Sequence, residues 1–159
     1  MRKIKDSLKS KFAQSLVTTS GDSQKVEIEY PKDAISKYIR LYGMEEFIDN
    51  LPDTVTLFEI VNSENNPLNL QLPQSFKKFK NLGTFFARNA VNEVPDVLKG
   101  MQELNFIALP DNPNITEVPE WIADLPNLIA LTFFGGNPDL KIGPKVQAKM
   151  DNEEINVMY

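Results

Sequence analysis

Apolar residues recur at every third position behind three prolines of the chain. The residues at +3, +6, +9 and +12 are Phe76, Phe79, Leu82 and Phe85 after Pro73, Leu98, Met101, Leu104 and Ile107 after Pro95, and Ile122, Leu125, Leu128 and Leu131 after Pro119. Each of these prolines, like Pro52, follows a Leu or Val, and successive prolines are 21, 22 and 24 residues apart. A period of this length predicts a solenoid, in which each coil buries its apolar face against its neighbours.

The end of each apolar series is expected to be a short strand. Residues two apart on a strand share a face, so Ile107 with Leu109, and Leu131 with Phe133, are predicted to point into the core. The proline suits the first turn of the returning segment, where its missing N–H costs nothing. Spacing by three favours one inward residue per turn if that segment is a 3₁₀ helix, and an apolar stripe if it is an α-helix.

These units resemble the leucine-rich repeat family, whose general form is L-x-x-L-x-L-x-x-N followed by an aliphatic-proline pair. The segments that carry the resemblance are 82–89, 104–112 and 128–137, which end in Asn89, Asn112 and Asn137. The resemblance covers residues 51–144 and about four repeats. It implies an α/β leucine-rich-repeat solenoid with short parallel strands. We expect each asparagine to bond backbone groups in the turn that leaves the strand.

The strands of such a fold line a concave surface, and the residues between core positions point outward on it. The predicted protein-binding residues are Thr84, Phe86 and Arg88, then Phe106, Ala108 and Pro110, and finally Ala130, Thr132 and Phe134. A row of exposed Phe86, Phe106 and Phe134 would form an apolar contact surface. The alternative is that the register slips by one residue and these rings belong to the core. Glu59 and Val61 are the outward candidates of the first repeat.

The N-terminal third has a different pattern. Residues 1–20 predict a basic amphipathic helical arm, whose apolar contact stripe is Ile4, Leu8, Phe12 and Leu16. The helix is expected either to fold back on its own domain, to dock on a partner, or to lie on a membrane surface. Residues 18–23 are polar and predict a linker, and residues 21–50 comprise this linker and an N-terminal α/β cap, with a strand at 26–30 and a helix from Pro31 to Tyr42. Residues 145–159 are expected to form a C-terminal cap or a tail.

The composition and charge of the chain exclude several kinds of functional site. The chain has 159 residues, no Cys and no His, so disulfides, thiolate sites and histidine catalysis are excluded. Its net charge of −5 argues against nucleic acid as a ligand of the repeat body. Residues 1–20 nevertheless carry +4, which leaves −9 on the remainder. No apolar run is long enough to span a bilayer. We expect a cytoplasmic or intracellular protein, no enzymatic activity, no cofactor and no metal.

Two further features have structural interpretations. Trp121 is expected to cover the joint between two repeats, or alternatively to anchor a partner. Gly135-Gly136-Asn137 lacks the Lys-Ser/Thr of a phosphate-binding loop, so turn chemistry is expected there.

The leading functional hypothesis is a non-enzymatic protein-protein interaction module that recognises protein partners. The alternative is a structural or accessory subunit of a larger assembly, such as a phage virion, with the N-terminal arm as its anchor. A third hypothesis is an enzyme regulator or a host-directed effector.

Overall fold

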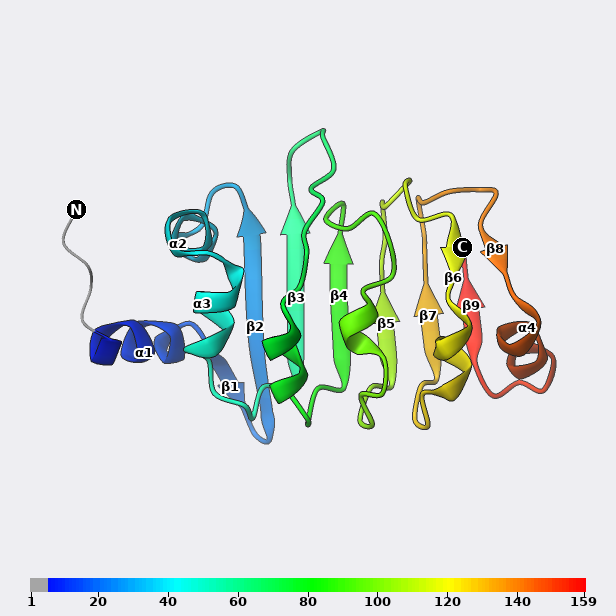
Figure 1. The fold of residues 1–159 in the computed structure, drawn as a ribbon, viewed down its shortest axis with the longest axis horizontal. Coiled ribbons are helices and arrows are strands. Elements are labelled where there is room, and N and C mark those ends of the chain that lie inside the picture. Colours follow the sequence, from blue (N-terminus) through cyan, green and yellow to red (C-terminus); the bar gives the residue numbers. More distant parts are fainter. Residues whose placement is uncertain (1–5) are drawn as a thin grey trace.

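The computed structural model describes residues 6–159, and it describes side chains from Lys11 onward. Within this range the chain forms a mixed α/β structure around a seven-stranded sheet of order β1-β2-β3-β4-β5-β7-β9. Only β1 is antiparallel to its neighbour, and all the other pairs of this sheet are parallel. In Figure 1 the sheet runs along the long axis of the molecule, with the N-terminal helix at one end and the last helix at the other.

The N-terminal part begins with helix α1 (Asp6–Ser15), which leads into strands β1 (Thr18–Ser20) and β2 (Ser23–Tyr30). The expected linker over residues 18–23 is therefore wrong. Thr18–Ser20 pairs with Ser23–Lys25 in a tight hairpin, and Gly21 has a φ of 59° in its turn. Polar, β-branched threonines on an exposed edge strand look like a linker in sequence, because there is no buried face to create alternation.

Two short helices follow β2, namely α2 (Ala34–Tyr42) and α3 (Met44–Asp49). Asp33 caps α2, since its Oδ1 accepts a hydrogen bond from the Ser36 N–H at 2.7 Å and its Oδ2 accepts one from the Glu29 N–H at 2.8 Å. Gly43, with a φ of 94°, separates the two helices. The strand expected over residues 26–30 and the helix expected after Pro31 are confirmed.

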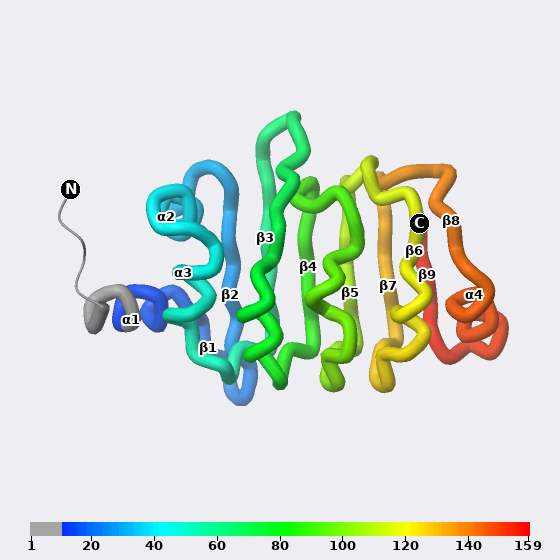
Figure 2. The backbone as a smooth tube through the Cα atoms, viewed as in Figure 1, coloured from blue at the N-terminus to red at the C-terminus, as the bar shows by residue number. Residues whose placement is uncertain are grey.

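The remaining chain alternates strands with returning segments, and each coil advances the sheet by one strand, as Figure 2 shows. The elements are β3 (Leu57–Asn62), η1 (Gln74–Lys78), β4 (Thr84–Arg88), η2 (Asp96–Leu98), β5 (Phe106–Ala108), β6 (Glu117–Val118), η3 (Glu120–Asp124), β7 (Ala130–Thr132), β8 (Lys141–Ile142), α4 (Pro144–Asp151) and β9 (Asn156–Met158). β6 and β8 form a separate two-stranded parallel pair.

The three returning segments after Pro73, Pro95 and Pro119 are 3₁₀ helices, so spacing by three places one apolar side chain per turn in the core. All twelve apolar residues of the +3 to +12 series are buried. Phe58 lies at the centre of an aromatic cluster, with ring centroids 5.0 Å from Phe76, 6.0 Å from Phe79 and 6.4 Å from Phe85. The predicted inward residues Ile107, Leu109, Leu131 and Phe133 are buried as well.

The C-terminal residues form an ordered end of the sheet. Helix α4 places Val146 in the core, and β9 pairs in parallel with β7 through Leu131 and Val157. Residues 145–159, which were expected to be a cap or a tail, thus continue the core by one helix and one strand.

The three asparagines of the repeat pattern do not occupy equivalent positions. Asn112 is buried, and its side chain bonds the backbone of the preceding coil: Nδ2 donates to the Ala87 carbonyl at 2.8 Å and Oδ1 accepts from the Ala90 N–H at 2.8 Å. Asn89 has a φ of 52°, and the carbonyl of Glu64 accepts its side-chain N–H. Asn137 instead accepts a hydrogen bond from the nearby Asp139 N–H. The expected backbone bonding holds for all three, but only Asn112 bridges coils from the interior.

The structure shows a different shared feature at the ends of these strands. Asn89, Asp111 and Gly135 each stand four residues after a core residue of the same sheet row, and all three have positive φ, at 52°, 57° and 72°. Asn, Asp and Gly are the residues that tolerate this conformation. The turn chemistry expected for Gly135 is therefore confirmed, and it belongs to every coil from β4 to β7.

Candidate binding face

The side of the sheet away from the returning segments presents the residues between the core positions. We call it the open face and define it by three rows that cross the strands. The rows are Lys25-Leu57-Thr84-Phe106-Ala130-Asn156, Glu27-Glu59-Phe86-Ala108-Thr132-Met158 and Glu29-Val61-Arg88, the last extended by Pro110 and Phe134 in the chain beyond β5 and β7. All nine predicted binding residues lie in these rows.

The alternation of burial agrees with the predicted register. Phe85 and Ala87 of β4 are buried, whereas Thr84 and Phe86 are half-buried and Arg88 is exposed. Phe106 is likewise half-buried while Ile107 is fully buried. Because a slip of one residue would reverse this order, the rings of Phe86 and Phe106 do not belong to the main core.

Two of the predicted contact residues are not accessible. Ala108 and Thr132 are only 3% and 4% exposed, although they occupy the middle row of the open face. In the row they lie between Phe86 and Met158, whose side chains are longer. The expected role of Ala108 and Thr132 as direct contacts is therefore wrong, because a partner cannot reach buried side chains.

The middle of the open face is apolar and aromatic. Phe86 and Phe106 are diagonal neighbours on adjacent strands, a separation at which aromatic side chains can reach each other. Phe134 follows β7 and is 53% exposed. Leu57 and Val61 of β3 continue the apolar surface, with half-buried side chains.

The β2 end of the open face is acidic. Glu27, Glu29, Glu59 and Asp33 line a groove of about 370 Å³ together with Ile28 and Val61. Lys25 forms ion pairs with Glu27 and, at 2.9 Å, with Glu59. The hydrogen bonds to Glu27 and Glu59 raise the pKa of Lys25, because these carboxylates stabilise its protonated form. Glu29 and Asp33 leave the groove with an excess of negative charge.

Sequence reasoning missed this acidic end, because it assigned β2 to a cap outside the repeat surface. The signal was present in the alternation of Val26, Ile28 and Tyr30 with Glu27 and Glu29. Parallel pairing of β2 with β3 then places both glutamates in the rows of the open face.

Arg88 is already engaged at the carboxyl ends of the strands. Its Nε donates to Oδ2 of Asp111 at 2.7 Å, and the two residues belong to successive coils. Both side chains remain about half exposed, at 55% and 41%. Arg88 therefore borders the apolar surface as one partner of an ion pair.

The N-terminal helix contacts its own domain through the two residues of the predicted stripe whose side chains are described, Phe12 and Leu16, together with Ala13. Ala13 is fully buried, Leu16 packs against the core, and the ring of Phe12 stacks on Tyr38 of α2 with centroids 5.7 Å apart. Ile4 and the side chain of Leu8 lie outside the described residues. Of the alternatives for this helix, the contacts of Phe12, Ala13 and Leu16 are those of a helix folded back on the domain.

Trp121 lies at a joint between coils. Its indole Nε1 donates to Oδ1 of Asp96 at 3.2 Å, and the partly buried ring packs against the core. This bond joins η3 to the start of η2. The contacts of Trp121 therefore agree with the expectation that it covers a joint between two coils.

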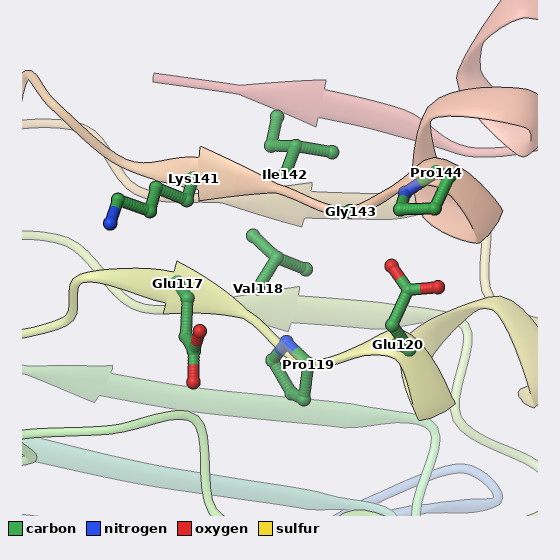
Figure 3. Close-up of a pocket in the computed structure, with 8 residues that line it drawn as sticks. All are labelled: Glu117, Val118, Pro119, Glu120, Lys141, Ile142, Gly143 and Pro144. Atoms are coloured by element: carbon green, nitrogen blue, oxygen red, sulfur yellow. The ribbon is translucent and has the colours of Figure 1, made fainter.

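A groove of about 610 Å³ runs between β6 and β8. Figure 3 shows the Glu120 carboxylate reaching across it toward Gly143 and Pro144. Glu120 Oε2 accepts a hydrogen bond from the Lys145 N–H at 3.2 Å, close to the start of α4. A Cβ on Gly143 would lie 1.7 Å from Glu120 Oε1, so the glycine makes room for this carboxylate. The groove is thus a joint at which one coil caps the helix of the next.

Residues 6–159 contain no cluster of acidic residues placed to hold a metal ion. None of the helices in this range combines the length and apolar character needed to cross a membrane.

No family model matches the sequence, and no curated protein matches it either. Among solved structures, a leucine-rich-repeat protein of Leptospira interrogans is similar over 71% of this chain, with 22% sequence identity and a TM-score of 0.48. The match spans only 27% of that protein's chain. The similarity assigns no function to the present chain.

Proposed function

We propose that this chain is a non-enzymatic protein-binding module, built as a short leucine-rich-repeat-like solenoid, and that the open face is its contact surface. The observation that carries the proposal is the half-buried pair Phe86 and Phe106, together with the exposed Phe134, on a sheet face whose register keeps them out of the core. Accessible aromatic side chains gathered on one face are typical of interaction sites.

Three features support the repeat architecture. Strands β3, β4, β5 and β7 each pair in parallel with the strand before them in the sheet, the segments that leave β3, β4 and β5 return through 3₁₀ helices, and the ends of β4, β5 and β7 share a residue with positive φ. A stack of this kind presents an extended surface for partners rather than an enclosed site.

The chemistry of the face defines the partner class. We expect a protein segment whose apolar side chains contact Phe86, Phe106 and Phe134, and whose basic side chains meet Glu27, Glu29 and Asp33 in the acidic groove. Complementary charge would mainly accelerate association and fix orientation, while the aromatic contacts would supply most of the affinity.

The test compares partner capture by the wild-type chain, the double variant Phe86→Ser/Phe106→Ser and the matched control Leu41→Ser. Leu41 is an exposed apolar residue on α2, so its replacement removes a similar amount of surface hydrophobicity elsewhere. A protein identified with wild type should bind the control equally well and the double variant at least tenfold more weakly. Equal binding by the double variant would refute the open face as the contact surface.

Charge reversal gives an independent check. The variant Glu27→Lys/Glu29→Lys should slow association with the same partner and weaken its dependence on salt, because screening acts on exposed charges.

The virion hypothesis used the N-terminal arm as the anchor to a larger assembly. Ala13 is buried against the domain, and the expected linker is the β1–β2 hairpin. We therefore do not extend that hypothesis to this chain.

A further inference from the structure

Three lysines line one pocket on the opposite side of the molecule from the open face. The pocket, of about 520 Å³, lies between the end of η1 and the loop after η2, and its lining residues are Lys77, Lys80, Lys99, Gly100, Met101 and Gln102. No acidic side chain lines it. This is unusual in a chain whose 22 acidic residues outnumber its 17 basic ones.

Repetition of the sequence places two of these charges side by side. Lys77 and Lys99 each stand four residues after the proline that opens their coil, so they are equivalent residues of neighbouring coils. The corresponding residue of the next coil is the uncharged Ala123. Since η1 packs beside η2, stacking brings the two like charges together, and like charges at adjacent positions oppose each other.

These lysines have no ionic partner within the described part of the chain. The ion pairs there involve Lys25, Arg88 and Lys149, and no side-chain hydrogen bond there is made by Lys77, Lys80 or Lys99. Lys78 shows the contrast, because it points into the preceding coil and donates to the Leu51 carbonyl at 2.6 Å. One lysine of this short basic segment is therefore structural, while its neighbours on either side are available to a ligand.

We propose that the Lys77–Lys80–Lys99 pocket binds a phosphate group carried by an organic molecule. Lysine ammonium groups on flexible stems bind phosphate as point charges, and three of them can neutralise a dianion. The pocket is larger than a phosphate alone requires. Met101, only 7% exposed, gives it an apolar wall, so the organic part of a phosphate ester would find apolar contact next to the charges. The site is independent of the open face, because it lies in the returning segments.

Binding is tested first with inorganic pyrophosphate, followed by amide NMR shifts at constant ionic strength. We expect saturable shifts confined to residues 77–80 and 99–102. The variant Lys77→Gln/Lys80→Gln/Lys99→Gln should bind at least about tenfold more weakly, since several charge-assisted contacts are removed. The matched control Lys32→Gln/Lys37→Gln/Lys145→Gln removes three exposed lysine charges elsewhere and should bind like wild type.

Equal pyrophosphate affinities of the two triple variants would overturn the proposal, because they would show that pyrophosphate is attracted by net charge alone. Thermal unfolding without ligand verifies that the pocket variant is folded. Its melting temperature should equal or exceed that of wild type, because repulsion between Lys77 and Lys99 is removed. A clear decrease would show that these lysines have structural contacts and would count against a ligand site.

The source of the phosphate is distinguished by a second set of probes. Glycerol 1-phosphate represents a small phosphate ester, and a phosphoserine peptide, compared with its unphosphorylated form, represents a modified protein. Tighter binding of either ester than of inorganic phosphate supports the role of the Met101 wall and identifies the source. Binding of pyrophosphate but of neither ester would refute the organic phosphate.

Discussion

The carboxylate of Asp111 occupies the space above Gly135, where a Cβ on the glycine would lie 2.1 Å from Asp111 Oδ1. The two residues hold the same position in successive coils. The Asp111 N–H donates a hydrogen bond to the Phe134 carbonyl at 2.8 Å, which joins the two coils at this point. From this position Asp111 accepts the hydrogen bond of Arg88. Residues of three coils are thus connected along the carboxyl ends of the strands, beside the aromatic part of the open face.

Replacement of Gly135 should test this connection. In Gly135→Ala the alanine has to adopt a φ of 72°, and its Cβ has to displace the carboxylate of Asp111. We therefore expect a loss of roughly 2–3 kcal/mol in the free energy of unfolding. Gly21→Ala is the matched control, since Gly21 has a φ of 59° and a Cβ there would meet no atom within 4 Å. It should cost only about 1–2 kcal/mol. Urea unfolding measures both, and equal losses would show that the Asp111 contact is unimportant.

Asn112 should be one of the most sensitive polar positions of the chain. Asn112→Ala removes the acceptor of the buried Ala90 and Val91 N–H groups and the donor to the Ala87 and Pro110 carbonyls. Because buried backbone groups then lack partners, we expect a loss of about 3 kcal/mol or more. The exposed Asn114, which bonds only the Asn92 side chain among the described contacts, supplies the control, and Asn114→Ala should cost under about 1 kcal/mol. A loss as small at Asn112 would contradict its bridging role.

Phe85 and Phe86 are adjacent in sequence, but their replacement by alanine should affect different properties, namely stability for Phe85 and partner binding for Phe86. Phe85→Ala opens a cavity in the aromatic cluster and should cost about 3–5 kcal/mol. Phe86→Ala should leave the melting temperature almost unchanged while it weakens partner binding, as should Phe106→Ala. Calorimetry and a binding assay on the same samples separate the two quantities. A collapse of the melting temperature in both Phe86→Ala and Phe106→Ala would place these rings in the core.

The buried hydroxyl of Tyr30 leads us to predict a loss of stability at alkaline pH. Burial raises the pKa of its hydroxyl from 10.0 to about 12, with a smaller contribution from Asp33. The folded state therefore retains a proton that the unfolded state releases, so this contribution is complete below pH 10 and is lost as the pH rises through 12. Unfolding curves between pH 9 and 12 should show a decline that is reduced in Tyr30→Phe.

At neutral pH the same variant should be at least as stable as wild type. The Tyr30 hydroxyl is buried and has no hydrogen-bond partner among the residues that the structure describes, and removal of such a group relieves up to about 1 kcal/mol of desolvation cost. A marked destabilisation by Tyr30→Phe at pH 7 would mean that the hydroxyl has a partner.

The sequence predicted the core positions between Phe76 and Phe133 well, because the signals for them are local and periodic. Spacing by three placed Phe76, Phe79 and Leu82 in the core, and alternation separated Phe85 from Phe86. The N-terminal end was predicted less well, since β1 has no buried face and its pairing with β2 leaves no periodic mark.

For the candidate binding face, the sequence predicted the side of the sheet on which the residues lie but not how exposed each one is. The nine residues of the expected surface lie on one face, but Ala108 and Thr132 are buried there, and their row continues to Met158 in a segment that was expected to be a cap or a tail. The acidic groove similarly needed the pairing of β2 with β3. Exposure depends on side-chain size across strands, which spacing along one segment does not report.

By itself the sequence determined the length of the coil, its turn chemistry and the side of each strand that faces the core, because these depend on the local period and on backbone preferences. Only the tertiary structure decided that Asn112 bonds the preceding coil from the interior, and that Lys77 and Lys99 line one pocket while Lys78 turns inward. It also decided that the N-terminal helix rests on Tyr38. These contacts join residues of different coils or elements, and their geometry exists only once the coils are stacked.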